Sequence, residues 1–270
     1  MYNQLLRLKT IILAVFCLTI MAASVAVAET YVVTSTSGGT EAGSIRWAVA
    51  QANANPGADV VSMMGLSGTI TLSGFGTYLD ISSEIHFVGP GMNSLTITST
   101  QGTFCDCTVM MRYGAAATFD DVTIGTGQFE GVHMDCNGSF ECNNSFTANR
   151  CRFIYTTTTP TNHLRTNGSG AAFTLNDCII DGQNSAGRRE MCYSGSQSTF
   201  NATRCTFMNC VATEGWGGAL RQSGGTMNLT NCTFFGNSAT YDGGAVYAGD
   251  DVTATITNCT FYGNRSISEG

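Results

Sequence analysis

The fold is decided by the stretch Met227-Asn228-Leu229-Thr230-Asn231-Cys232-Thr233-Phe234, because its apolar pattern returns at a fixed interval along the chain. The cysteine position shows this interval most plainly. Five cysteines follow one another at steps of 27 residues: Cys151, Cys178, Cys205, Cys232 and Cys259. A repeat of constant length predicts a solenoid, in which each coil packs against its two neighbours.

Three further apolar columns accompany the cysteines. The position two residues later holds Phe153, Ile180, Phe207, Phe234 and Phe261. The position three residues earlier holds Ala148, Leu175, Ala202, Leu229 and Ile256, and the position five residues earlier holds Phe146, Phe173, Phe200, Met227 and Ala254. An earlier coil has the same pattern with valine in place of cysteine: Ala117, Phe119, Val122 and Ile124. We predict that equivalent side chains stack above one another in a common apolar interior.

The steps between apolar residues predict the path of one coil. Side chains on one face of a strand recur at every second residue. Met227 and Leu229 keep this step, but Leu229 and Cys232 are three residues apart, so the chain must bend at Thr230-Asn231. Asparagine tolerates the left-handed backbone conformation of a tight bend. We predict coils of strand, two-residue bend, strand, loop and strand, which stack in parallel at about 4.8 Å. The fold class is all-β, a right-handed parallel β-helix.

The second bend position forms a polar column: Asp121, Arg150, Asp177, Arg204, Asn231 and Asn258. Stacking in register would alternate opposite charges along one corner and continue them with an asparagine ladder. We interpret this column as structural, because exposed ion pairs contribute little to stability and chiefly fix the register.

We interpret the cysteine column as buried free thiols, because unpaired cysteine behaves as a small apolar side chain. Six cysteines lie off the column: Cys105, Cys107, Cys136, Cys142, Cys192 and Cys210. Disulfides Cys136–Cys142 and Cys192–Cys210 are the pairings we consider. A zinc site is disfavoured, since Cys105 and Cys107 have no matching second pair and the histidines are scattered. These are His86, His133 and His163.

Three regions are expected along the chain. Residues 1–28 have the composition of an export signal: Arg7 and Lys9 precede a short apolar run, and Ala26-Val27-Ala28 fits a cleavage site. The alternative is a membrane anchor, for which the run is short. Residues 29–110 are expected to form an amino-terminal cap and irregular first coils, and residues 111–270 the regular coils. Gly270 falls where the next Gly-Gly-Ala strand would begin, so we expect a longer protein.

The cap is expected to contain a short helix. Ser44 can cap a helix from Ile45 to about Ala54, with an apolar face that would cover the first coil. The face consists of Ile45, Ala48, Val49 and Ala52. Strands are expected near residues 31–33, 60–61, 69–72, 85–87 and 95–97.

Charge excludes two classes of partner. Without residues 1–28 the chain has 10 basic and 19 acidic residues, a net charge of 10 − 19 = −9, and no lysine. Nucleic-acid binding and attachment to an anionic membrane surface both need clustered basic residues. No segment after residue 28 is apolar enough for a transmembrane helix.

Two tetrapeptide patterns alternate along the last coils. Phe234-Phe235-Gly236-Asn237 and Phe261-Tyr262-Gly263-Asn264 fit FxxN, while Gly217-Gly218-Ala219-Leu220 and Gly243-Gly244-Ala245-Val246 fit GGA[ILV]. This alternation resembles the repeats of the polymorphic outer membrane proteins of chlamydiae and their relatives. The stretch from Tyr31 to Thr98 is similar to the opening of secreted bacterial proteins with pectin-lyase-like β-helix repeats.

The resemblance implies a secreted or surface-exposed passenger, often adhesive, with host or matrix proteins or glycans as partners. It also implies that any membrane anchoring, for example by an outer-membrane barrel, would lie beyond the given sequence.

The alternative function is a carbohydrate-active enzyme, because the same fold carries polysaccharide lyases and glycosidases. A glycosidase needs two carboxyls about 5–9.5 Å apart. Asp121 and Asp177, two coils apart at about 9.6 Å with Arg150 between them, are the best catalytic set in the sequence. The remaining acids, Asp120, Asp181 and Asp250-Asp251, fit turns, and His133 and His163 are expected in loops. We assign no catalytic, cofactor-binding or metal residue and predict binding or a structural role.

Overall fold

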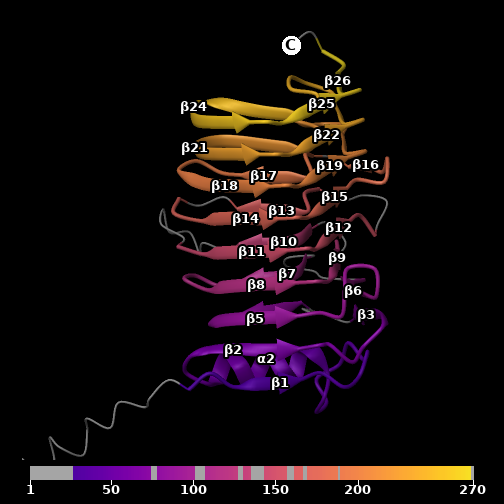
Figure 1. Ribbon diagram of the computed structural model, residues 1–270, viewed down its shortest axis with the longest axis vertical. Helices are drawn as coiled ribbons and strands as arrows, with labels where there is room; N and C mark the ends of the chain where they lie inside the picture. The colour runs from indigo at the N-terminus through magenta and orange to yellow at the C-terminus, as the bar shows by residue number, and fades with distance from the viewer. Residues whose placement is uncertain are drawn as a thin grey trace, which may run out of the picture.

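The computed structural model describes residues 27–268, except 74–77, 101–106, 127–129, 135–142, 157–160, 167–168 and 188. Over these residues the chain is a right-handed parallel β-helix, whose coils follow one another along the long axis of the molecule (Figure 1). Equivalent strands of successive coils pair in parallel, at an interval of 27 residues in the later coils. The predicted fold class is confirmed.

Three walls of strands enclose the interior. The first wall consists of β1 (Thr30–Val32), β2 (Ala58–Ser62), β5 (Glu84–Val88), β8 (Ala116–Asp120), β11 (Ser145–Asn149), β14 (Ala172–Asn176), β18 (Ser198–Thr203) and the later residues of β21 (Leu220–Thr230) and β24 (Val246–Thr257). The second wall consists of β4 (Leu79–Ile81), β7 (Cys107–Met111), β10 (Glu130–Met134), β13 (Leu164–Thr166), β17 (Cys192–Ser194) and the first residues of β21 and β24. Because β21 pairs with both β17 and β18, these two walls form one hydrogen-bonded sheet.

The third wall is a separate sheet of mostly short strands. It consists of β3 (Gly68–Leu72), β6 (Leu95–Ser99), β9 (Thr123–Gly125), β12 (Arg152–Ile154), β15 (Ile179–Asp181), β19 (Thr206–Met208), β22 (Thr233–Phe235) and β25 (Thr260–Tyr262). A small sheet continues from it in the later coils, with β16 (Ala186–Gly187), β20 (Val211–Ala212), β23 (Ser238–Ala239) and β26 (Arg265–Ser266).

The interior is built from the predicted apolar columns. On the first wall Phe146 pairs in register with Phe173, and Phe173 with Phe200. On the third wall the rings of Phe207 and Phe234 stack with centroids 4.6 Å apart. These side chains are fully buried, whereas Ile256 and Phe261 of the last described coil are each 47% exposed. The prediction that side chains one repeat apart lie above one another is confirmed.

The corner between the first and third walls is the predicted bend. All six residues of the polar column have the left-handed conformation, with φ between 51° and 56°: Asp121, Arg150, Asp177, Arg204, Asn231 and Asn258. The sequence argument explained asparagine at this place, and the structure shows that aspartate and arginine adopt the same conformation. The parallel pairing of the flanking strands in every coil imposes this bend on whichever residue stands there.

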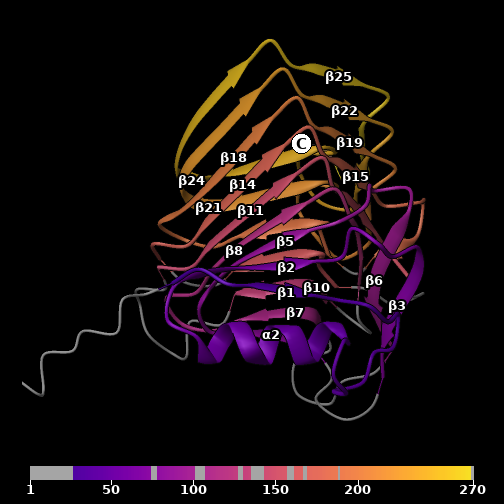
Figure 2. The ribbon, with the colours of Figure 1, turned by 60° about the horizontal axis from the view of Figure 1, so that its bottom comes forward.

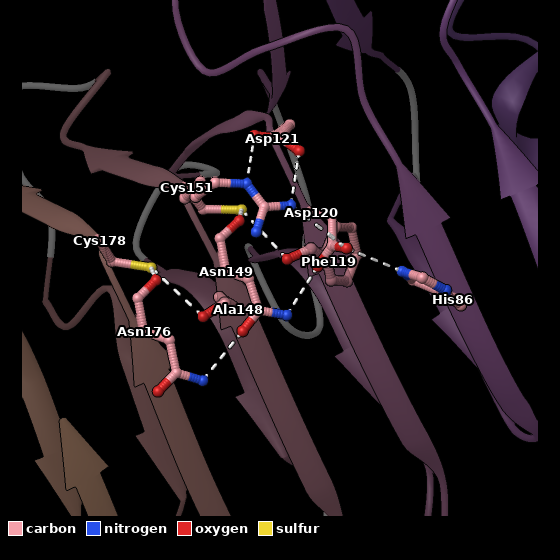
Figure 3. A network of polar contacts seen from close by, with 10 residues as sticks. His86, Phe119, Asp120, Asp121, Ala148, Asn149, Cys151, Asn176 and Cys178 are labelled. Atoms are coloured by element: carbon pink, nitrogen blue, oxygen red, sulfur yellow. Dashed lines mark hydrogen bonds and ion pairs between the residues drawn. The ribbon is translucent and has the colours of Figure 1, made fainter. Parts of the chain in front are cut away.

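The charges of this corner stack as predicted, and each arginine turns toward the acid of the preceding coil. Arg150 donates from Nε and Nη2 to the two carboxylate oxygens of Asp121, at 2.8 and 2.7 Å. Arg204 binds Asp177 in the same way, at 2.6 and 2.7 Å. An amide ladder runs beside the corner, because Asn176 donates to Asn149 and Asn149 donates to Asp120 (Figure 3).

The cysteine column consists of free thiols. Cys151, Cys178, Cys205 and Cys232 are buried, and Cys259 is half-buried. Their thiols lie within hydrogen-bonding distance of main-chain carbonyls, as for Cys178 and Ala148 O at 3.4 Å (Figure 3). A buried thiol cannot easily ionise, and desolvation accordingly raises the pKa of Cys151 to about 12.

One cysteine prediction is wrong. Cys192 and Cys210 are both free and fully buried, so they do not form the disulfide that we considered. Each belongs to the apolar interior of its own coil, Cys192 on the second wall and Cys210 after the third, where a thiol packs like any small apolar group. Cys105, Cys136 and Cys142, and with them the pairing Cys136–Cys142, lie outside the described residues, as do residues 1–26 and Gly270.

The amino-terminal cap contains the predicted helix, α2 (Ile45–Ala54). Ser44 is its N-cap and accepts a hydrogen bond from the main-chain N–H of Trp47 at 3.3 Å. The buried face is the predicted one: Ile45, Ala48, Val49 and Ala52. Figure 2 shows α2 lying across the amino-terminal end of the coils. Within the described residues, no helix is long and apolar enough to cross a membrane.

Candidate binding site on the second wall

The acids and the arginine that we considered for catalysis lie in the corner ladder. Asp121 is paired with Arg150, and Asp177 is paired with Arg204 rather than with Arg150. The hydrogen bond from Arg204 is the main reason that the pKa of Asp177 lies below its usual value. The arrangement of these residues is that of a stacked ion-pair ladder on an exposed edge, which agrees with our structural interpretation.

Of the two histidines that we expected in loops, His133 lies in a strand and His163 lies in the bend before a strand. His133 lies on β10, and its Nδ1 is 2.5 Å from Glu130 Oε2. His163 is completely buried just before β13, where Nε2 donates to the carbonyl of Ile124 at 2.9 Å. Burial of this ring lowers the pKa of His163 to about 4, because the interior disfavours the charged imidazolium. The loop prediction is wrong for His133 and right for His163, although the burial of His163 was not foreseen; neither residue follows the 27-residue columns on which the sequence argument depended.

A column of arginine and tyrosine side chains runs along the outside of the second wall. The strand pairings place its members directly above one another: His133, Arg165, Tyr193, Arg221 and Tyr247. We call this set the arginine–tyrosine column. Sequence reasoning missed it, because its spacings of 32, 28, 28 and 26 residues vary with the lengths of the intervening loops. The GGA[ILV] patterns were the available clue, since each leads into a strand of this wall.

A concavity of about 350 Å³ opens beside the middle of this column. Its volume falls within the range of small-ligand sites, about 300–1,000 Å³. It is lined by Thr161, Asn162, Arg165, Arg189, Glu190, Tyr193 and Arg221. We call it the Arg221 pocket.

Aromatic rings hold Arg221 in place. Its guanidinium carbon lies 4.6 Å from the ring centroid of Trp216, 5.3 Å from that of Tyr193 and 5.9 Å from that of Tyr247. These are cation–π distances, and three such contacts restrict the rotamers of an otherwise mobile side chain. The column therefore presents a preorganised cation flanked by apolar ring faces.

Glu190 is the buried acid of the pocket. Its side chain is only 1% exposed, and its nearest counter-charge is Arg221 Nη1, 3.8 Å from Oε1. This distance is too long for a hydrogen bond. Among the residues that the structure describes, neither Glu190 Oε2 nor Arg221 Nε has a hydrogen-bond partner. Burial outweighs the nearby arginines and raises the pKa of Glu190 above its ordinary value.

A second acid on this wall is fully paired. Glu130 binds both His133 and Arg165 through its two carboxylate oxygens. Burial by itself would raise the pKa of Glu130, but the hydrogen bonds and charges of His133 and Arg165 outweigh it, so the pKa is lowered. Arg165 is therefore closely paired with its acid, Glu130, whereas Arg221 meets its acid, Glu190, only at 3.8 Å.

The site has donors, aromatic faces and one poorly paired acid, which suits the binding of a polar ligand. Within the described part of the chain, no group of three or more His, Cys, Asp and Glu side chains is placed to hold a metal ion.

No family model matches this sequence, and no curated protein matches it. Among solved structures, the chain is similar to ORF18 of Geobacillus virus E2, with 12% identity and a TM-score of 0.33. That alignment covers 89% of this chain and 62% of the viral chain, so this chain spans less than two thirds of the viral protein. It is also similar to the A-module of the mannuronan C-5 epimerase AlgE4 of Azotobacter vinelandii, with 11% identity and a TM-score of 0.25, over 78% of this chain and 88% of that module.

Proposed function

We propose that this protein is an exported β-helix that binds a glycan through the arginine–tyrosine column. The observation that carries the proposal is the vertical alignment of Arg165, Tyr193, Arg221 and Tyr247 on one rigid wall beside the Arg221 pocket. Aromatic faces pack against the C–H faces of sugar rings, while guanidinium groups donate to sugar oxygens. Strands about 4.8 Å apart offer such contacts at intervals along an extended chain.

The rigidity of the second wall supports a binding function. The second wall is fixed by continuous main-chain pairing from β4 to β21, and its outward side chains are ordered by stacking on one another. A surface that is ordered before it meets its ligand loses little conformational entropy on binding. The targeting composition of residues 1–28 and the resemblance to polymorphic outer membrane proteins lead us to place this activity outside the cell or on its surface, as an adhesive or matrix-binding passenger.

The FxxN residues have a structural role that is compatible with such a passenger. Asn237 is buried, and it donates to the carbonyl of Phe207 at 3.0 Å while its Oδ1 accepts from the N–H of Cys210 at 3.1 Å. Asn264 makes the equivalent bond to Phe234 at 2.9 Å. These asparagines tie successive coils together, which leaves the outward columns free to vary with the ligand.

Expression of the full chain followed by glycan-array binding tests the proposal. We expect secretion with a mature end at Glu29, and binding that Tyr193→Ala or Arg221→Ala weakens about tenfold or more, since both contacts would be lost from the centre of the site. Arg204→Ala is the matched control, because this arginine lies in the corner ladder on another face. Retention in the cell, or equal effects of all three substitutions, would contradict the proposal.

The second candidate function is that of a carbohydrate-active enzyme, and Glu190 is the observation that favours it. General acids are often carboxyl groups in a pocket whose burial raises their pKa, and Glu190 has both features. Release of reducing or unsaturated sugar from a polysaccharide panel, abolished by Glu190→Gln, would establish catalysis. Binding without product release would favour the first candidate.

A further inference from the structure

The Arg221 pocket contains an imbalance of charge that a glycan of hydroxyl groups alone would not correct. Three guanidinium groups line it, those of Arg165, Arg189 and Arg221. Arg165 is paired with Glu130, whereas the acid that faces Arg221, Glu190, is too far from it for a hydrogen bond. The protein as a whole is acidic, with a formal net charge of −7. A cluster of arginines on such an acidic molecule is a local feature that favours ligands with negative charge.

Two buried groups also lack the partners that buried groups normally have. Within the described residues, Arg221 Nε and Glu190 Oε2 have none, although an unsatisfied buried polar atom is costly. The pocket thus holds an N–H donor, Arg221 Nε, that has no acceptor among the described residues. The Glu190 carboxylate lies beside the same guanidinium and would compete with a ligand anion for it. The Arg221 side chain as a whole is 22% exposed, so a ligand oxygen can approach the accessible part of its guanidinium and supply the close charge partner that Glu190 does not.

We propose that the Arg221 pocket is an oxyanion subsite, which takes one carboxylate or sulfate group of the ligand on Arg221 and in which Glu190 competes for that guanidinium. The proposal rests on the proposed glycan-binding function and names the charged group that the glycan carries. Arginine donates to such groups through two parallel N–H bonds, and the rings around Arg221 already fix the plane of its guanidinium.

Two contacts surround Glu190, whose carboxylate lies near Arg221 without forming a hydrogen bond to it. Asn162 donates to the main-chain carbonyl of Glu190 at 2.7 Å, which anchors the backbone at this position. On the other side Gly215 lies so close that an added Cβ would be 2.6 Å from Oε2. The first contact fixes the backbone of Glu190, and the second limits the space around Oε2.

Small oxyanions test the subsite directly. The ring of Trp216 packs on Arg221, so its fluorescence reports on the pocket during titration of the full chain with sodium sulfate or acetate against chloride at constant ionic strength. We expect saturable binding of both oxyanions and none of chloride. Arg221→Gln should weaken binding about tenfold or more, because a charge-assisted bond is lost. Arg204→Gln, in the corner ladder, should leave it unchanged.

Glu190→Gln separates this proposal from a merely structural role for the pocket. Removal of the competing charge should tighten sulfate binding roughly threefold or more. A structural Glu190 would instead weaken binding when replaced, and an unchanged or weakened affinity in a folded Glu190→Gln protein would overturn the proposal. This substitution also keeps the proposal falsifiable if Arg221→Gln fails to fold.

Titrations with sulfated, carboxylated and neutral oligosaccharides identify which charged group the ligand carries. They also separate the subsite proposal from the proposed glycan-binding function. Preference for one acidic series, lost in Arg221→Gln, supports both proposals and names the group. Sulfate binding without any glycan binding would overturn the proposed function and leave the subsite standing. Equal binding of neutral and acidic glycans, insensitive to Arg221→Gln and Glu190→Gln, would overturn the subsite and leave the function standing.

Discussion

Replacement of Asn237 by alanine measures how strongly the coils are tied together. The Asn237 side chain is only 1% exposed. It serves the carbonyl of Phe207 and the N–H of Cys210 within the same buried turn, at 3.0 and 3.1 Å. Asn237→Ala would leave the N–H of Cys210 without a partner and remove one donor from the carbonyl of Phe207, which also lies in the β19–β22 ladder. An unsatisfied buried group costs about 1–3 kcal/mol and a lost hydrogen bond about 0.5–1.5 kcal/mol, so we expect the free energy of unfolding to fall by about 1.5–4.5 kcal/mol.

Asn264→Ala is the matched control one coil later. Asn264 makes the same pair of bonds, since it donates to the carbonyl of Phe234 at 2.9 Å and its Oδ1 accepts from the N–H of Asn237 at 3.0 Å, but its side chain is only half-buried. Water can replace a lost partner at such a position, so we expect a loss of about 1 kcal/mol or less. The measurement is urea unfolding followed by circular dichroism, supported by hydrogen exchange at Phe207 to Cys210, since a solenoid unfolds in segments. Equal losses for the two variants would refute the argument from burial.

Three further predictions concern charges and thiols. A double-mutant cycle on Asp177 and Arg204 should show favourable coupling that added salt removes, because both groups are exposed. Mass mapping after alkylation should find Cys259 modified before Cys205, since a hydrogen bond with the neighbouring thiol and burial raise the pKa of Cys205 to about 12. Burial raises the pKa of Glu190, so its contribution to stability is complete below its ordinary value of 4.5 and is lost as pH rises through the raised value. Glu190→Gln should therefore raise the melting temperature at pH 7 and bring no gain below about pH 4.5, where the native acid is itself neutral.

The interior could be predicted from the sequence because stacking constrains it strictly. Phe200 must lie above Phe173, so the number of residues between them is fixed at 27 wherever both are core residues. The bend was predictable for the same reason, from the odd step between Leu229 and Cys232. The helix at residues 45–54 was predictable from its cap and its single apolar face.

The candidate site could not be found in this way, because outward side chains carry no packing constraint. Arg165, Tyr193 and Arg221 align only after the loops between them have been given their actual lengths. Glu190 was missed since its burial depends on Gly215, a residue 25 positions away in the chain. The burial of His163 was missed because a buried histidine has no distinguishing pattern in a single sequence.

The unpaired thiols have a consequence for where this chain can mature. Seven cysteines of the described coils are free thiols: Cys151, Cys178, Cys192, Cys205, Cys210, Cys232 and Cys259. Main-chain pairing, apolar contact and side-chain hydrogen bonds join the coils at these positions. The reactive form of cysteine is the thiolate, which a raised pKa suppresses, and oxidants therefore find little to attack inside the stack. The packing of these seven thiols therefore depends on no disulfide and is compatible with reducing as well as oxidising surroundings.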